Sequence, residues 1–123
     1  MTKILPILYG NVYNKRLTAF YTAIYFKRFG QYPKINFLPY YCMLKRVFVK
    51  YGEIKVAGAI LMHFEQNGEK IIAEKFPIMW LEKNVDRYLS QLQEYHDINT
   101  EDEKALYEAV KNRLNYLEID YKL

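Results

Sequence analysis

Apolar residues recur at three- and four-residue intervals through most of the chain, the spacing typical of helices that bury one face. In residues 12–29 this face consists of Leu17, Phe20, Tyr21, Ile24 and Phe29. Gly30 follows at the position where a helix commonly ends, and Lys27 and Arg28 precede it, where the helix dipole favours cations. The pattern therefore predicts a helix over residues 12–29.

A connection that contains two prolines separates this helix from the next. The segment QYPKINFLP covers residues 31–39, and Pro33 and Pro39 bias the residues before them away from helical geometry. Pro39 itself suits the first turn of a helix. The pattern predicts a second helix over residues 39–51 and, after Gly52, a third over residues 53–66. The apolar face of the second helix consists of Tyr40, Leu44, Val47, Phe48 and Tyr51.

The segment EKIIAEKFPIMW, residues 69–80, has no clear helical pattern. Ile71 and Ile72 are β-branched, and Pro77 limits a continuous helix. Residues 70–76 are therefore candidates for a short strand, with residues 3–8 as its pairing partner. Beyond this segment, helical spacing predicts a fourth helix over residues 79–95, with an apolar face of Leu81, Val85, Tyr88, Leu89 and Leu92.

The segment DINTEDEKALYEAVKNRLNYLEI, residues 97–119, has the clearest helical signal. Thr100 and Glu103 have the spacing of a capping box, in which each side chain bonds a backbone N–H of the first turn. The inward stripe that follows is Leu106, Val110, Leu114 and Leu117. Five helices with short connections predict a mostly α, compact single domain that spans residues 1–123.

Charge is divided unevenly along the chain. Residues 1–52 contain nine Lys and Arg and no acidic residue, whereas residues 53–123 contain the other nine basic residues and all 14 acidic ones. The two halves therefore carry formal charges of +9 and −5. Self-repulsion within the basic half favours contact with opposite charge. Nucleic acid, an acidic protein, a membrane surface and the acidic half of the same chain could each provide it.

The basic residues of the first two predicted helices and their connection are candidate contacts for DNA. Arg16 and Lys27 are eleven residues apart, about three helical turns, and so share one side of the first helix. Cations on such a surface contact phosphates and give affinity without reading base sequence. The candidate cations are Lys15, Arg16, Lys27, Arg28, Lys34, Lys45, Arg46 and Lys50.

Tyr25, Tyr32 and Tyr41 lie beside these cations and off the best core positions. If their rings are exposed, they can stack on unpaired bases, an interaction worth about 1–3 kcal/mol per base. The alternative is that the rings are buried in the core and leave only their hydroxyl groups in water.

The sequence contains no recognisable catalytic or metal-binding pattern. His63 and His96 lie far apart and lack the spacing of a metal site. Cys42 is the one cysteine, which excludes an intramolecular disulfide and a cysteine-based zinc site. A nucleophile–base pair of Cys42 with one histidine is the remaining catalytic option, but a half-buried free thiol is what we expect. The glycines are isolated, so we expect no phosphate-binding loop, no cofactor and no enzyme activity.

The helices predicted over residues 39–51 and 53–66 flank Gly52, a residue suited to the turn of a helix-turn-helix. Phe48 stands where close helix crossing favours a small residue, and Lys55 is the one basic residue near the start of the second helix of the pair. A helix that reads the major groove carries more hydrogen-bond donors there. The pattern does not favour a groove-reading motif.

A run of turn and core residues resembles a short helical module of phage and plasmid replication-associated proteins, including proteins similar to helicase loaders. The resemblance covers residues 20–64 and rests on Phe29-Gly30, Pro33-x-Ile35-Asn36, Tyr51-Gly52, Ala59-Ile60 and Phe64. It implies a small phage-type accessory protein that acts on DNA or on the replication machinery, and it implies no catalytic residue.

The preferred interpretation is a non-enzymatic, phage-type accessory protein whose basic half binds DNA or the replication machinery. Its acidic half, especially residues 97–118, would face a protein partner or a second copy. The alternative is a structural or interaction protein, such as a virion component, connector or host-protein inhibitor, that binds an acidic protein surface. The start MTKILPILYGNVYNKR lacks a signal-peptide pattern, and no segment is long and apolar enough to span a membrane. We therefore expect a cytoplasmic protein without membrane or small-molecule partners.

Overall fold

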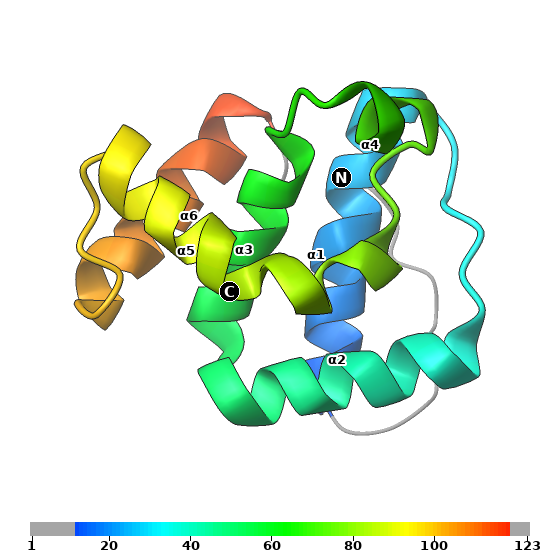
Figure 1. Cartoon of the computed structure of the whole chain (residues 1–123), viewed down its shortest axis with the longest axis horizontal. Helices are drawn as coiled ribbons and strands as arrows, with labels where there is room; N and C mark the ends of the chain where they lie inside the picture. Colours follow the sequence, from blue (N-terminus) through cyan, green and yellow to red (C-terminus); the bar gives the residue numbers. More distant parts are fainter. Residues whose placement is uncertain (1–11, 119–123) are drawn as a thin grey trace.

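The computed structural model describes residues 12–118, with the side chains of residues 16–36 and 38–118, and it is mostly helical (Figure 1). Its α-helices are α1 (Val12–Phe29), α2 (Phe37–Tyr51), α3 (Glu53–Phe64), α4 (Glu69–Ala73), α5 (Val85–Tyr95) and α6 (Glu103–Tyr116). Two 3-10 helices, η1 (Ile78–Trp80) and η2 (Glu82–Asn84), precede α5. Residues 12–118 contain no strand. The prediction of a mostly α, compact single domain is confirmed.

The structure corrects two predictions for the middle of the chain. Residues 69–73 form a sixth α-helix, α4, so residues 70–76 do not supply the predicted strand, and residues 3–8 lie outside the described residues. Lys75 and Phe76 have φ angles of 60° and 53°, a left-handed conformation that neither a helix nor a strand continues through. Because Pro77 follows, the chain re-enters helical geometry only as two 3-10 turns, and α5 begins at Val85 instead of residue 79.

The central element of the fold is α3. All nine residues from Val56 to Phe64 are buried, and α3 packs against α1, α2, α5 and α6. Figure 1 shows α3 standing between α1 and the α5–α6 pair, with α2 crossing one end. From Val56 onward α3 has no free face, and only its first turn, residues 53–55, reaches the surface, half-buried. A helix that enters a DNA groove needs a longer exposed face, so this arrangement does not favour the α2–Gly52–α3 segment as a groove reader.

Gly58 allows α5 and α6 to approach α3 closely. A Cβ atom at this position would lie 3.1 Å from Cδ1 of Leu92 in α5 and 3.2 Å from Cδ1 of Leu106 in α6. Both leucines are buried, so each would have to shift by a few tenths of an ångström within the core. The absence of a side chain at Gly58 thus sets the spacing of three helices.

The start of α6 differs from the predicted capping box of Thr100 and Glu103. The N-cap residue is Asp102, whose Oδ1 accepts a hydrogen bond of 3.2 Å from the backbone N–H of Ala105. An aspartate at the N-cap satisfies an exposed backbone donor and also favours the positive end of the helix dipole. Thr100 lies before the helix and is buried.

We expect Gly58→Val to destabilise the protein by about 1–3 kcal/mol, because the added methyl groups would overpack the contact with Leu92 and Leu106. Gly68→Val is the matched control, since the nearest atom to its Cβ would be 3.7 Å away, and we expect a change within about 0.5 kcal/mol. Urea denaturation measures both values. Equal stability of the two variants would contradict the proposed role of Gly58.

Candidate nucleic-acid interface

Arg16 and Arg46, two of the candidate cations, are paired with carboxylates from the second half of the chain. Arg16 Nε lies 2.9 Å from Glu53 Oε1 at the start of α3. Arg46 Nε and Nη2 each donate a 2.8 Å hydrogen bond to a carboxylate oxygen of Glu82 in η2. These hydrogen bonds lower the pKa of Glu82 and raise that of Arg46. Two cations of the predicted patch therefore already face negative charge.

Lys27 and Arg28, at the end of α1, also have partners in the second half. Lys27 Nζ lies 3.6 Å from Glu118 Oε2, and both side chains are exposed, so this pair is weak. Arg28 Nη1 donates a 3.0 Å hydrogen bond to the carbonyl of Phe64, and its guanidinium carbon lies 4.4 Å from the ring centroid of Phe76. Arg28 thus holds the end of α1 against α3 and the segment after α4.

Lys50 is exposed at the end of α2, where acidic groups lie close by. Its Nζ is 5.2 Å from the ring centroid of Tyr51, and the Tyr51 hydroxyl donates a 2.7 Å hydrogen bond to Asp86 Oδ1. Burial, and next the hydrogen bond to Asp86, raise the pKa of Tyr51. By contrast, Lys34 and Lys45 are exposed and form no ion pair with any described residue. The side chain of Lys15 lies outside the described residues.

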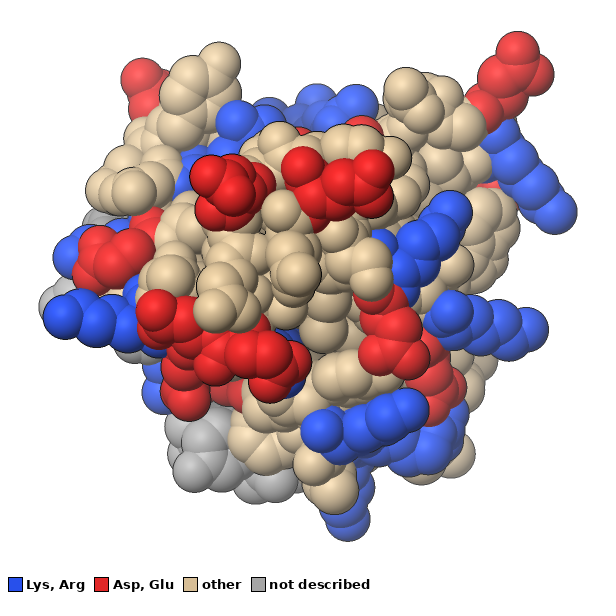
Figure 2. Space-filling model, turned by 60° about the vertical axis from the view of Figure 1, so that its left-hand side comes forward, with Lys and Arg blue, Asp and Glu red and all other residues tan. Residues whose placement is uncertain are grey.

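Charged side chains of both signs share one face of the molecule. On the face shown in Figure 2, Asp and Glu side chains lie among Lys and Arg side chains, with uncharged surface between the groups. The acidic half of the chain therefore neutralises part of the basic half, one of the alternatives that the sequence left open. Fewer cations are therefore available to bind an external anion than the sequence predicted.

The three candidate tyrosines differ in exposure. Tyr25 is buried, and its ring centroid lies 4.6 Å from that of Phe29 and 5.9 Å from that of Tyr21. Tyr41 is half-buried on α2. Tyr32 is 37% exposed, and its ring lies 4.8 Å from that of Phe26, centroid to centroid. Of the three, Tyr32 therefore presents the ring that an external base can reach most easily.

A cleft of about 430 Å³ brings together three of the candidate residues, Tyr25, Tyr32 and Lys34. One wall is the connection of residues 31–36, and the other is formed by residues 74–75 and 77–79. Lys75 belongs to the second wall, with its Nζ 5.7 Å from the ring centroid of Phe29, and we call this space the Lys34–Lys75 cleft. Lys75 was not predicted to be a site residue, because residues 70–76 were predicted to form a strand in the acidic half.

The second wall of the cleft is fixed by the aromatic residue Phe76. Its backbone is left-handed, but its side chain is buried and packs against the rings of Phe29 and Phe64. The hydroxyl of Tyr21 donates a 2.8 Å hydrogen bond to the Phe76 carbonyl, and burial raises the pKa of Tyr21, so this donor stays protonated. A left-handed residue costs about 1–3 kcal/mol, which the surrounding contacts must offset.

His63 on α3 also fixes the second wall of the cleft, through a hydrogen bond to Pro77. Its Nε2 lies 2.8 Å from the Pro77 carbonyl, and its Nδ1 lies 2.8 Å from the Tyr88 hydroxyl. Because a carbonyl can only accept, Nε2 carries the proton, and Nδ1 accepts from Tyr88. Burial is the main cause that lowers the pKa of His63, so its ring stays neutral. The ring therefore joins α3, α5 and the cleft wall through two uncharged hydrogen bonds.

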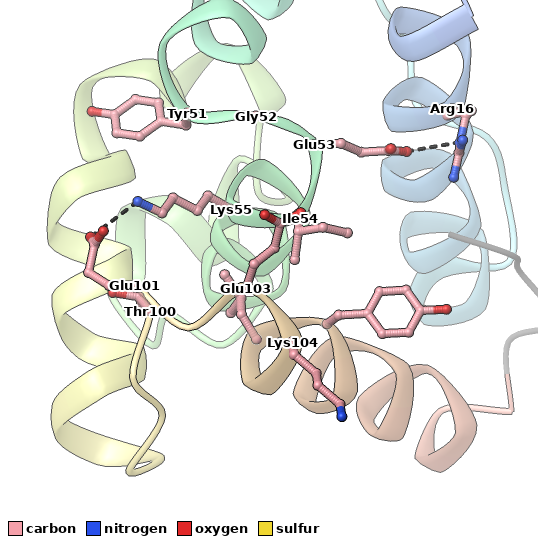
Figure 3. Close-up of a pocket in the computed structure, with 12 residues that line it drawn as sticks. Arg16, Tyr51, Gly52, Glu53, Ile54, Lys55, Thr100, Glu101, Glu103 and Lys104 are labelled. Atoms are coloured by element: carbon pink, nitrogen blue, oxygen red, sulfur yellow. Dashed lines mark hydrogen bonds and ion pairs between the residues drawn. The ribbon is translucent and has the colours of Figure 1, made fainter.

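A larger hollow of about 810 Å³ lies around the start of α3 (Figure 3). In Figure 3 the side chains of Glu53 and Lys55 leave α3 in opposite directions, Glu53 towards Arg16 and Lys55 towards Glu101, at 2.9 Å and 3.1 Å. The charged residues that line the hollow are three cations and three carboxylates: Arg16, Lys55, Lys104, Glu53, Glu101 and Glu103. These charges cancel, so the larger hollow has no net attraction for an anion.

The remaining reactive side chains are separate from one another. Cys42 is exposed on α2, where the sequence analysis expected a half-buried thiol. Both ring nitrogens of the buried His63 are bonded, to Tyr88 and Pro77, and His96 Nε2 lies 3.1 Å from Glu65 Oε1. Among the described side chains, no group of three His, Cys, Asp or Glu is placed to hold a metal ion.

None of the described helices has the length and apolar character needed to cross a bilayer.

No protein-family model, curated protein or solved structure matches the chain. The resemblance of residues 20–64 to replication-associated proteins therefore stays a prediction.

We expect the free energy of unfolding to fall as the pH drops below about 6.5, the ordinary pKa of an unfolded histidine. The unfolded chain then binds a proton that the buried His63 refuses, and the loss ends below the lowered pKa of the folded state. Urea denaturation between pH 7.5 and pH 5 measures the slope, which for one proton reaches about 1.4 kcal/mol per pH unit.

His63→Gln should be less stable at neutral pH and should show a flatter pH dependence, because glutamine does not titrate. His96→Gln is the control, since His96 is exposed and pairs with Glu65. An unchanged slope in His63→Gln would show that another group carries the pH dependence. The charged groups near His63 include Arg87, which also disfavours its protonation.

Proposed function

We propose that this chain is a non-enzymatic accessory protein of phage type that binds single-stranded DNA at the Lys34–Lys75 cleft. The observation that carries the proposal is the composition of the cleft: a partly exposed tyrosine, Tyr32, lines it with two exposed lysines that form no described ion pair. One carboxylate, that of Glu74, also lines it, so the charge of the lining is +1.

The two kinds of side chain suit the two parts of a nucleotide. Lysines bind phosphate oxygens as point charges and give affinity without base sequence. An aromatic ring offers stacking to a base whose own face is free, which occurs in a single strand and not inside a duplex. The volume of the cleft, about 430 Å³, lies within the range of pockets that hold small aromatic ligands.

The arrangement of the helices favours a single strand over a duplex. Sequence-specific duplex binding usually requires an exposed helix that enters the major groove. The helix in the corresponding position, α3, is buried from Val56 to Phe64 and exposes no continuous face. The cations outside the cleft are dispersed among carboxylates, and this dispersal weakens binding to a long duplex backbone.

The proposed role agrees with the resemblance of residues 20–64 to replication-associated proteins. We propose that the protein acts in the host cytoplasm, on single-stranded DNA exposed during replication. The acidic half would then serve two purposes, as an internal counterion for the basic half and as a contact for other proteins.

Replacing both cleft lysines, Lys34→Glu with Lys75→Glu, should abolish most binding to a labelled single-stranded oligonucleotide, measured by fluorescence anisotropy at several salt concentrations. Each phosphate contact on a single strand contributes about 0.7 to the log–log salt slope, so the slope should become shallower by about 1.4. Lys83→Glu with Lys111→Glu changes the net charge equally at exposed positions outside the cleft lining and is the control. Equal losses in both double variants would mean that net charge, and not the cleft, governs binding.

Tyr32→Ala should weaken single-strand binding by about tenfold or more, because one stacked base contributes about 1–3 kcal/mol. Binding to a duplex of the same length should change little. Tyr95→Ala removes a tyrosine that is 67% exposed on α5 and should leave both affinities unchanged. If Tyr32→Ala and wild type bind the single strand equally well, Tyr32 does not stack on a base.

A further inference from the structure

α2 has a second apolar face, on the side opposite the core. Leu38 and Val49 are 75% and 74% exposed, and Cys42 is exposed between them. These positions and Lys45 follow one another at intervals of three and four residues, so they form one line along the helix, the outer ridge of α2. The buried line on the opposite side consists of Tyr40, Met43, Leu44 and Val47.

The outer ridge has the dimensions of a helix–helix contact. Leu38 and Val49 are eleven residues apart, a distance of about 16 Å along the helix at 1.5 Å per residue. Single exposed apolar side chains are common on protein surfaces. Here, however, two exposed aliphatic side chains and a thiol lie on one line. Their spacing is the one by which a partner helix packs against a helix. Tyr41 and Phe48, which are half-buried, extend the apolar surface on one flank.

The charges of α2 decide which partner suits this ridge. α2 contains Lys45, Arg46 and Lys50 and no acidic residue. Arg46 is already bonded to Glu82, so Lys45 is the cation that the ridge itself presents. A second copy that packed α2 against α2 would bring the two Lys45 side chains close together with no carboxylate on either helix, and their repulsion would oppose the contact. A nucleic acid would satisfy Lys45 but would gain little from burying Leu38 and Val49. A helix with an apolar stripe flanked by carboxylates satisfies both features.

We infer that the outer ridge of α2 is a docking surface for an acidic amphipathic helix supplied by another protein. Its leucine-type side chains would bury Leu38 and Val49, and its carboxylates would pair with Lys45. This inference does not depend on DNA binding, because none of the ridge residues lines the Lys34–Lys75 cleft.

Cys42 provides a direct readout, since it is the single cysteine of the chain and lies on the ridge. The probe is a synthetic helical peptide with leucines along one stripe and glutamates at the flanking positions. Its binding is measured as the slowing of the reaction between the Cys42 thiol and a disulfide reagent. A peptide with the same leucines and lysines in place of the glutamates is the matched control.

We expect the acidic peptide to slow the reaction about tenfold or more at saturation, and the basic peptide to have little effect. Leu38→Ser with Val49→Ser should weaken the acidic peptide's binding by about tenfold, a loss of about 1.4 kcal/mol. Ile72→Ser, which alters another exposed aliphatic residue on α4, should leave binding unchanged. Circular dichroism and thermal melting verify that the variants keep the fold.

Four results would overturn the inference. The acidic peptide could fail to protect Cys42, or the basic peptide could protect it equally. Protection that rises with the concentration of the protein alone would indicate a second copy as the occupant. Protection by anionic phospholipid vesicles or by an oligonucleotide, without protection by the peptide, would indicate a lipid or nucleic-acid surface. The Lys34→Glu, Lys75→Glu variant separates the two proposals, because it should lose single-strand binding and keep peptide binding.

Discussion

The complete burial of α3 is the constraint on which the rest of the structure depends. A helix with nine consecutive buried residues must be covered on every side, and α1, α2, α5 and α6 are the elements that cover it. Gly58 permits two of these helices to come close, and His63, a buried polar residue of α3, is hydrogen-bonded through both ring nitrogens. Surfaces that a ligand can reach therefore lie on the outer helices, on their connections and at the first turn of α3.

Ion pairs within the molecule neutralise part of the charge difference between the two halves. Carboxylates of the second half meet cations of the first half at three places: on α1 at both ends and on α2 beside η2. Pairs that are this exposed add little stability individually. Their main effect is on recognition, because among the described residues they leave a few lysines without an ion pair instead of one broad basic patch.

Local patterns in the sequence predicted the helices well and the irregular middle of the chain poorly. The bounds of α1 agree with the prediction because a regular stripe, terminal cations and Gly30 all indicate the same end. Residues 70–76 were predicted as a strand from two β-branched residues. Tertiary burial of Phe76, which no local pattern reports, decides their conformation instead.

The candidate interface was predictable only in part, for a similar reason. The sequence identified Lys34 and Tyr32 by their charge and their place off the core stripe. It could not show that Arg16, Lys27 and Arg46 face carboxylates 36 to 91 positions further along the chain, because such pairs depend on the packing of helices. Lys75 enters the cleft through a left-handed turn, a geometry that its neighbours in the sequence do not indicate.

The left-handed pair Lys75 and Phe76 has a consequence for any molecule that enters the cleft. Buried rings and the hydrogen bonds of Tyr21 and His63 already hold this wall in one conformation. A ligand would therefore spend little of its binding free energy on ordering a loop, and it would meet a rigid surface at first encounter. Discrimination between ligands would then come from shape, since a rigid wall cannot adjust to a poor fit.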